Sequence, residues 1–319
     1  MRLLVIILNH NTPALTLECL QSLAPEIAVR PDAGVVVLEN GSTHDSAARL
    51  QSAIAADGWS SWVELMVSPK NLGFTAGNNL VIRHALECPK PPEFFLLLNS
   101  DTVVLPGALE ALLGLLEQEP KAGIAGSRLE YPSGVIQGSP FRFHSIISEL
   151  DRGLAIGLFS RMVASFTRYD PKPCCAAPVD WVAGASMLIR RETILDVGLL
   201  DEKYFAYFED MDLCLAAARK GWQTWYVPAS RIVHIEGASS GIRAEAHEST
   251  PLYYFHGRRW YFRKNHGLFY AAMADAALIS GCAIGMLYAI IRRREPRFAF
   301  AKLKDSFLHS VFAAGLGRV

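Results

Sequence analysis

The chain has 319 residues, of which 51% are hydrophobic, so it can bury a core large enough for one big domain or two modest ones. Lysine plus arginine and aspartate plus glutamate number 31 each, which excludes a bulk field that would draw the whole protein to nucleic acid. The six cysteines have no CxxC spacing and their one close pair, Cys174–Cys175, is vicinal. We therefore expect a reduced, cytoplasmic protein without a disulfide framework.

The first hundred residues alternate between two periodicities. Short apolar runs at 3–8, 35–38 and 94–98 predict strands, while 13–24 and a segment beginning near Ala76 predict helices between them. The first run precedes a polar stretch rather than a small-residue cleavage site, so we interpret it as a buried strand and not as a signal peptide. This alternation predicts an α/β fold with a doubly wound, mostly parallel sheet.

Polar clusters follow each predicted strand. They are Asn9-His10-Asn11, Glu39-Asn40-Gly41-Ser42 and Asn99-Ser100-Asp101. In doubly wound sheets ligands bind at the carboxyl ends of the strands, so these clusters mark the expected site. Asp101, at the end of FFLLLNSD, offers an oxygen ligand of the kind that Mg²⁺ and Mn²⁺ prefer beside phosphates. A turn or helix cap at Asp101 is the equally weighted alternative.

The second half of the chain shows a less regular hydrophobic periodicity. A helix is expected over 107–118, loops over 126–178, and a strand entering a helix over 181–192. An acidic cluster, FEDMD at 208–212, opens the next helix, and a strand follows at 231–235.

Two features of this half suggest chemistry. Glu209, Asp210 and Asp212 lie within four residues, and such close like charges raise one another's pKa, which suits a general base. Acids at a helix start also complement the helix dipole, so a structural role stays open for one or two of them. His234 ends an apolar strand and is either an imidazole ligand or a hydrogen-bonded structural histidine.

Taken in order, these blocks resemble the inverting family-two glycosyltransferases of GT-A fold, in particular the rhamnosyltransferase-like and galactofuranosyltransferase-like group. The resemblance runs from residue 3 to about 266. The blocks that carry it are LVIILNHNT, VVVLENGSTHDS, NLGFTAGNN, LLLNSD, WVAGASMLIRRE and the segment 198–220. It implies a catalytic GT-A domain over 1–266, with a nucleotide-sugar-binding half (1–101) and an acceptor-side half (102–266).

The resemblance also implies roles. Asp101 and His234 would hold Mg²⁺ or Mn²⁺, Asp210 would be the general base, and Glu209 or Asp212 would orient groups around it. The donor, a UDP- or dTDP-sugar, would be bound by residues from the strand ends and the glycine-containing loop: Asn9, Asn11, Glu39, Asn40, Ser42, Asn71, Gly73, Gly77, Asn78, Asn99 and Ser100. A metal-dependent hexosyl- or deoxyhexosyl-transferase, acting with inversion on a saccharide or lipid-linked acceptor in cell-envelope polysaccharide, lipopolysaccharide or glycolipid assembly, is the expected function.

Two positions depart from the family pattern. Asn99 stands where many members have the first aspartate of the metal motif, and Glu39 stands where the nucleoside turn usually has aspartate. These departures leave the contact of Asn99 with the metal and the identity of the donor base open. For Gly73, Gly77, Asn78 and Asn79, a plain helix entry after a loop is the alternative to donor binding.

The tail, 267–319, changes character. Leu268 to Ile291 carries one formal charge, Asp275, and ends in Arg292-Arg293-Arg294. A membrane span, a helix lying on the membrane surface, and a helix packed on protein or on a second copy all fit. The basic amphipathic segment from Phe298 onward favours a helix that contacts the membrane surface or forms a homo-oligomer over a true span. The protein would then be peripheral on the inner face of the cell membrane.

Rival functions are a non-catalytic nucleotide-sugar-binding scaffold of the same fold and a nucleotidyltransferase. The latter needs a Gly-rich basic loop after the first strand, where residues 9–13 read Asn-His-Asn-Thr-Pro instead. Nucleic-acid binding is not expected, since no recognition motif is present.

Overall fold

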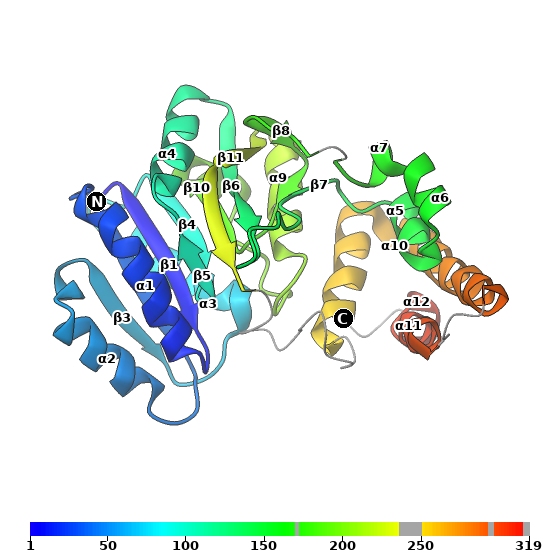
Figure 1. The fold of residues 1–319 in the computed structure, drawn as a ribbon, viewed down its shortest axis with the longest axis horizontal. Coiled ribbons are helices and arrows are strands. Elements are labelled where there is room, and N and C mark those ends of the chain that lie inside the picture. Colours follow the sequence, from blue (N-terminus) through cyan, green and yellow to red (C-terminus); the bar gives the residue numbers. More distant parts are fainter. Residues whose placement is uncertain (170–171, 236–250, 293–296, 315–319) are drawn as a thin grey trace. The chain divides into compact units, whose positions relative to one another are not determined.

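The chain divides into two units in this computed structural model, which describes residues 1–169, 172–235, 251–292 and 297–314 (Figure 1). The sheet unit comprises 1–140, 173–205 and 209–247, and the helical unit comprises 141–172, 206–208 and 248–319. The expected division at residue 266 therefore differs from the observed grouping, in which 141–172 and 248–266 belong with the tail.

The sheet unit contains the expected alternation of strands and helices. Its strands are β1 (Leu3–Asn9), β2 (Ala33–Asn40), β3 (Val63–Ser68), β4 (Phe94–Asn99), β5 (Thr102–Val104), β6 (Ala122–Glu130), β8 (Ala177–Val179), β9 (Trp181–Val182), β10 (Ser186–Arg190) and β11 (Gln223–His234), with β7 (Pro140–Phe141) at its boundary. Its helices are α1 (Pro13–Ala28), α2 (Ser46–Ala56), the 3₁₀ turn η1 (Trp59–Ser61), α3 (Gly73–Leu86), α4 (Ala108–Gln118), α8 (Arg191–Val197) and α9 (Glu209–Arg219).

The main sheet has the order β3-β2-β1-β4-β10-β6-β11-β5, with β8 added beside β11. Strands β3, β2, β1 and β4 are parallel, as the βαβ pattern requires, whereas β10 runs antiparallel between β4 and β6. The sheet is therefore parallel over β3, β2, β1 and β4 and mixed over its remaining strands.

Apolar side chains alternate between the two faces of the sheet. Leu3, Val5 and Ile7 of β1 belong to the core formed with α1, α2 and α4. Helix α3 contacts β1 and β2, and Leu4 and Val81 line the same pocket. Helices thus pack on both faces of the sheet.

The helical unit consists of helices in the part of it that the structure describes. They are α5 (Ile146–Leu154), α6 (Gly157–Met162), α7 (Ala164–Thr167), α10 (Leu252–Ile291), α11 (Arg297–Leu308) and α12 (Val311–Ala314). The expectation of loops over 126–178 was wrong for α5 to α7, whose short helices give no long period in the sequence. Arg293, Arg294 and residues 315–319 of the predicted tail lie outside the described residues.

Helix α5 packs against α10 by backbone contact. A Cβ added to Gly153 would lie 2.5 Å from the Leu278 carbonyl oxygen, and one added to Gly281 would lie 2.7 Å from that of Leu150. Only glycine allows helices to approach this closely. Helix α10 is itself bent at Gly267, where φ is 84° and ψ is 170°, so that Leu268–Ile291 forms a separate helical segment.

Candidate active site

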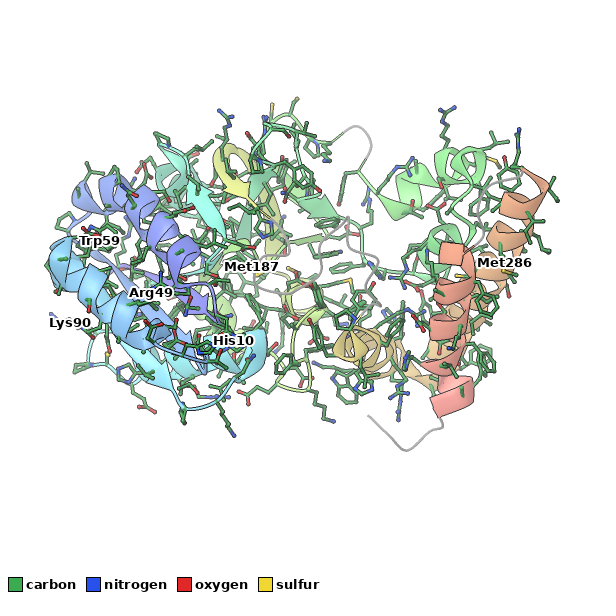
Figure 2. All side chains as sticks on the ribbon, turned by 60° about the horizontal axis from the view of Figure 1, so that its bottom comes forward. His10, Arg49, Trp59, Lys90, Met187 and Met286 are labelled. Atoms are coloured by element: carbon green, nitrogen blue, oxygen red, sulfur yellow. The ribbon has the colours of Figure 1, made fainter. Side chains whose placement is uncertain are left out.

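The predicted polar clusters lie together at the carboxyl edge of the sheet. In the parallel register Asn9 is opposite Glu39, and Leu8 is opposite Asn99. His234, at the end of β11, is opposite Thr102, next to Asp101. Four segments far apart in the sequence therefore converge, and His10, labelled in Figure 2, follows the first of them.

Asp101 and His234 form the centre of this edge. Asp101 is 1% exposed, and His234 Nε2 lies 3.4 Å from its Oδ1. Within the described part of the chain, neither carboxylate oxygen of Asp101 has a hydrogen-bond partner. A buried carboxylate without a donor is costly, so these two oxygens are free to accept a partner from outside the protein, such as a cation.

Two amides hold the imidazole of His234 in place. Gln137 Nε2 donates to the His234 carbonyl oxygen at 2.6 Å, which turns its Oε1 toward His234 Nδ1 at 3.1 Å. Nδ1 is then the nitrogen that donates to Gln137, and Nε2 lies on the side of Asp101. Asn99 Nδ2 lies 3.3 Å from the same Nε2. Sequence reasoning missed Gln137, because it lies in the aperiodic stretch and matches no motif.

Donor atoms around Asp101 are few. Among the described residues, no group of three or more His, Cys, Asp or Glu side chains is arranged to hold a metal ion. One carboxylate and one imidazole nitrogen nevertheless fit Mg²⁺ or Mn²⁺ when phosphate oxygens and water complete the coordination.

Glu39 has its carboxylate hydrogen-bonded within the turn that follows β2. It is 3% exposed; Oε1 accepts from Ser42 N–H at 2.9 Å, and Oε2 accepts from the Ser46 hydroxyl at 2.8 Å and from Asn9 Nδ2. Gly41 sits in this turn with φ at 67°, and a Cβ there would lie 2.1 Å from the Lys70 carbonyl carbon. The longer side chain of glutamate thus reaches inward and fixes the turn.

Asn11 is the exposed member of this region. Its φ is 59°, and its Oδ1 accepts from Thr43 N–H at 2.9 Å, while its own N–H donates to Ser42 Oγ at 2.8 Å. Ser100, in contrast, is 1% exposed and bonded to Thr12. Among the predicted donor-binding residues at this turn, Asn11 is thus exposed and Ser42 half-buried.

The loop before α3 is tied to β2 by Asn40. Its Oδ1 accepts from Leu72 N–H at 2.9 Å, and its Nδ2 donates to the Gly73 carbonyl at 3.1 Å. Asn71 Oδ1 accepts from Gly73 N–H at 2.8 Å. Gly73 has φ at 75° and approaches Phe205, since a Cβ would lie 2.5 Å from the Phe205 carbonyl oxygen. These side chains build the loop.

Three further residues of α3 are buried. Gly77 packs on Leu8, where a Cβ would lie 2.6 Å from a methyl carbon, and Asn79 bonds Leu200 and Glu202. Asn78 donates to the Phe74 carbonyl at 2.8 Å, while its Oδ1 lacks a partner within the described residues. The structure thus gives packing or structural contacts to Gly77 and Asn79.

The acidic cluster opens α9, as expected. Asp210 is partly exposed and accepts from Gly184 N–H through Oδ2 at 3.0 Å. Asp212 is buried and accepts from the Tyr204 hydroxyl at 3.1 Å. Burial, and then the neighbouring Asp210, raise the pKa of Glu209 well above its usual range. The three acids are therefore distinct, and Asp210 is the one that combines exposure with a fixed orientation.

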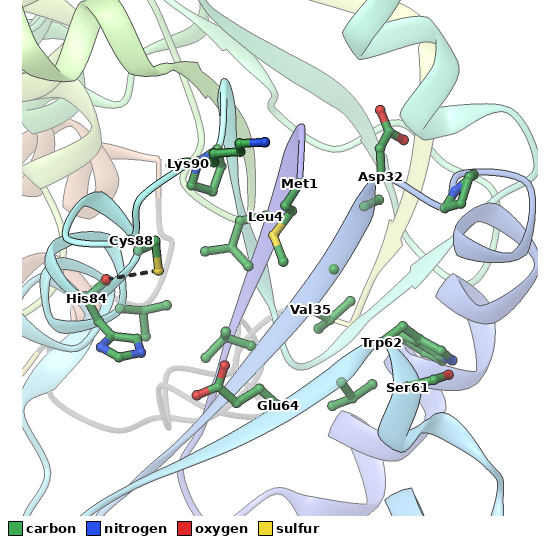
Figure 3. A pocket seen from close by; sticks show the side chains of 18 of the residues that line it. Met1, Leu4, Asp32, Val35, Ser61, Trp62, Glu64, His84, Cys88 and Lys90 are labelled. Carbon is green, nitrogen blue, oxygen red and sulfur yellow. Dashed lines mark hydrogen bonds between the residues drawn. The ribbon is translucent and has the colours of Figure 1, made fainter.

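A cavity of about 410 Å³ lies elsewhere on the sheet unit (Figure 3). Met1, Asp32, His84, Cys88 and Lys90 line it, near the amino ends of β1 and β2 and the end of α3. None of the predicted site residues lines this cavity. It is thus separate from the carboxyl edge.

Comparisons with known proteins agree on the class of the chain. The model described as "Glycosyltransferase like family 2" matches residues 2–261. The chain is 28% identical over 232 residues to the N-acetylglucosaminyl-diphospho-decaprenol L-rhamnosyltransferase of Mycobacterium tuberculosis, covering 69% of this chain and 72% of the relative. It is 24% identical over 193 residues to rhamnosyltransferase WbbL of Escherichia coli, covering 60% and 67%.

Two solved structures share the fold. GalNAc-T7 with UDP, GalNAc and Mn²⁺ aligns with a TM-score of 0.61 at 14% identity, covering 97% of this chain but only 57% of that one. The mannosyltransferase PcManGT of Pyrobaculum calidifontis, with GDP-Man and Mn²⁺, aligns with a TM-score of 0.56 at 14% identity, covering 98% and 86%. The predicted GT-A fold is confirmed by these likenesses.

Proposed function

Since the chain belongs to glycosyltransferase-like family 2, a family of inverting glycosyltransferases, we propose that it moves a sugar from a nucleoside-diphosphate donor to a saccharide hydroxyl on a lipid-linked acceptor. A hexosyl or deoxyhexosyl group is the expected cargo, with L-rhamnose first, because both curated relatives named above are rhamnosyltransferases. The unpartnered, buried carboxylate of Asp101 beside His234 is the observation that carries the proposal.

Asp101 and His234 are the proposed protein ligands of Mg²⁺ or Mn²⁺. When bound, such an ion stabilises the negative charge that develops on the leaving diphosphate. Gln137 holds His234 with Nε2 on the side of Asp101, where it would bind the ion, and Asn99 Nδ2 lies 3.3 Å from the same nitrogen. Asp101 itself lies in the turn between β4 and β5, where its carbonyl oxygen accepts from Ile235 N–H at 3.0 Å.

The nucleoside lies against the turns after β1 and β2 in this proposal. Asn11 and Ser42 supply contacts to a UDP- or dTDP-sugar, while Asn9 and Glu39 set the shape of the turn beneath it. Asn40, Asn71 and Gly73 position the loop before α3 that borders the donor. Because both carboxylate oxygens of Glu39 already accept hydrogen bonds within the turn, neighbouring groups would recognise the nucleobase of the donor.

Asp210 is the proposed general base. Its Oδ2 is held by the Gly184 N–H, which orients the carboxylate that would accept the proton of the acceptor hydroxyl. A single base suffices for inversion, because the hydroxyl attacks the anomeric carbon directly from the face opposite the leaving diphosphate. Glu209 and Asp212 are buried beside it and support the helix start.

The test is Asp210→Asn. This amide keeps the shape but cannot take a proton, so transfer should fall by about 10²–10⁴-fold while donor-dependent thermal stabilisation persists. Transfer at the wild-type rate would remove Asp210 from the reaction. Donor stabilisation of the wild type without any transfer would instead support the non-catalytic nucleotide-sugar-binding scaffold.

The proposed setting is the cytoplasmic side of the cell membrane, in assembly of cell-envelope polysaccharide. The relative that acts on a decaprenol-linked sugar supports this setting.

A further inference from the structure

The zero net charge of the chain hides two strongly charged units. The helical unit contains 16 lysines and arginines against 7 aspartates and glutamates, a net charge of +9, which leaves the sheet unit with 15 against 24, a net charge of −9. Such asymmetry points to an anionic partner for the helical unit.

Two acids in the described part of the helical unit are buried in ion pairs. Glu149 and Asp275 are buried and paired with Arg258, through contacts of 2.7 Å to Glu149 and a shorter one to Asp275. Among the described residues of this unit no acid is classed as exposed, whereas Arg161, Lys264, Arg292 and Lys304 are. The fully exposed charges among the described residues of this unit are thus cationic.

An uncharged stripe runs along the second segment of α10. Its members follow helical spacing and are all exposed: Phe269, Met273, Ala276, Ser280, Ile284, Leu287 and Ile291. Phe269 is 80% and Ile291 79% exposed. At 1.5 Å per residue the stripe is about 33 Å long. A helix face exposed to water is normally charged, so this stripe marks an interaction surface.

Neighbouring helices add to the same kind of surface. Leu158, Met162 and Phe166 of α6 and α7 recur every four residues and are 66–72% exposed. Phe300 and Phe307 of α11 are 61% and 51% exposed. Helices α5 and α11 both contact α10, and α7 contacts α5. Met286, labelled in Figure 2, lies between stripe members Ile284 and Leu287 in the sequence and is only half-buried.

Helix α10 passes the length and hydropathy test for a membrane span, with a mean hydropathy of 1.8 over its best window and 28% of that window buried. Two contacts argue that it does not cross. Its inner face carries Asp275, which pairs with Arg258 and accepts from Val311 N–H at 2.7 Å. That face also packs tightly on α5, which holds Glu149, Asp151 and Arg152 within nine residues. If α10 crossed the membrane, these charged side chains would have to enter the hydrocarbon core of the bilayer, which is costly.

We propose that the helical unit docks onto an anionic lipid bilayer, with the α10 stripe and the exposed apolar residues of α6, α7 and α11 in the interface and the surrounding basic residues on lipid phosphates. Apolar insertion and charge attraction together produce this kind of binding. A second copy of the chain is the poorer occupant, because an isologous dimer would bring two units of charge +9 together. The inference deepens the proposed function, since it brings the enzyme to a lipid-linked acceptor.

The test is flotation of the full chain with vesicles of phosphatidylcholine mixed with phosphatidylglycerol, and with phosphatidylcholine alone, without donor or acceptor. Wild type should float with the anionic vesicles, weakly with the neutral ones, and less at high salt. The double variant Ile284→Glu/Leu287→Glu should lose about 100-fold in partitioning, about tenfold for each side chain. Both side chains are exposed, so folding should be unaffected.

The matched control is Val29→Glu/Leu195→Glu, which changes two exposed apolar residues of the sheet unit. It should bind like wild type. Wild type that ignores anionic vesicles, or a stripe variant that binds normally, would overturn the proposal. So would a dimer in light scattering that the stripe variant abolishes, or resistance of the cell-membrane-bound protein to alkaline carbonate, which indicates a span. None of these readouts depends on transfer, so failure of the proposed function would leave them unchanged.

Discussion

Replacing Asp101 with Asn should stabilise the protein without metal and abolish its response to metal. The two carboxylate oxygens of Asp101 are buried without hydrogen-bond donors, and His234 Nε2 lies 3.4 Å from Oδ1. An amide at this position removes the charge and can donate from Nδ2 to the lone pair of Nε2. Relief of one unsatisfied buried group is worth about 1–3 kcal/mol.

This gain should be visible as a rise in melting temperature. For a domain the size of the sheet unit, each kcal/mol corresponds to about 2–4 °C, so the metal-free variant should melt about 2–12 °C above wild type. In wild type, Mn²⁺ with a nucleotide sugar at about 100 times its Kd should add about 2.7 kcal/mol, and this increment should vanish in the variant. Differential scanning fluorimetry with and without Mn²⁺ and donor measures both effects.

A cap role for Asp101 makes the opposite prediction. Asn caps helices and turns about as well as Asp, so stability would change little and the shift with Mn²⁺ and donor would be kept. Asp101→Asn that melts at or below the wild-type temperature, and still responds to Mn²⁺, would refute the assignment of this carboxylate to a metal site.

Three further predictions concern single contacts. Gln137→Leu should weaken Mn²⁺ binding about 10–100-fold in electron paramagnetic resonance titrations, because it removes both contacts that hold His234; binding at the wild-type level would exclude the positioning role. Glu209→Gln should raise the free energy of unfolding at pH 8 but not at pH 4, as measured by urea unfolding. Because the pKa of Glu209 is raised in the folded state, the wild type loses stability as pH rises, by about 1.4 kcal/mol per pH unit up to that pKa, and glutamine does not ionise. Glu149→Gln should destabilise the helical unit by about 3–5 kcal/mol in the same assay, by leaving Arg258 with one fewer carboxylate; an effect below about 1 kcal/mol would contradict a buried pair.

The Glu149 site also sets an acid limit. Although burial opposes ionisation, the charges of Arg152 and Arg258 hold the pKa of Glu149 below its usual range. A depressed folded-state pKa means that the stability it provides is present at neutral pH and is lost as pH falls below about 4.5. Wild type should therefore unfold on acidification more steeply than Glu149→Gln.

Much of the sheet unit could be predicted from its periodicity. Runs such as FFLLL admit one interpretation when helices of suitable length flank them, and each strand ends at a polar cluster that marks the ligand-binding edge. The positions of Asp101 and His234 followed from strand ends, and the structure places them 3.4 Å apart.

Other features could not be predicted, because they depend on contacts that are distant in the sequence. Gln137 lies in an aperiodic stretch and acquires its role only when β11 brings His234 to it. Helices α5 to α7 are too short to show a period, and their grouping with α10 rests on glycine contacts between residues about 130 apart, such as Gly153 and Gly281. The pairing of Asp275 with Arg258, likewise, is invisible in a hydropathy profile that marks α10 as a span.

Product formation tests the central claim most directly. Purified full-length protein should be incubated with Mn²⁺, an N-acetylglucosaminyl-diphospho-polyprenol acceptor and dTDP- or UDP-sugars, dTDP-rhamnose first, and the lipid-linked product examined by mass spectrometry with Asp210→Asn as the control. We expect an acceptor heavier by one sugar, formed by the wild type with a divalent cation and reduced about 10²–10⁴-fold in the variant. A product that forms equally well in a chelator, or with Asp210→Asn, would contradict it.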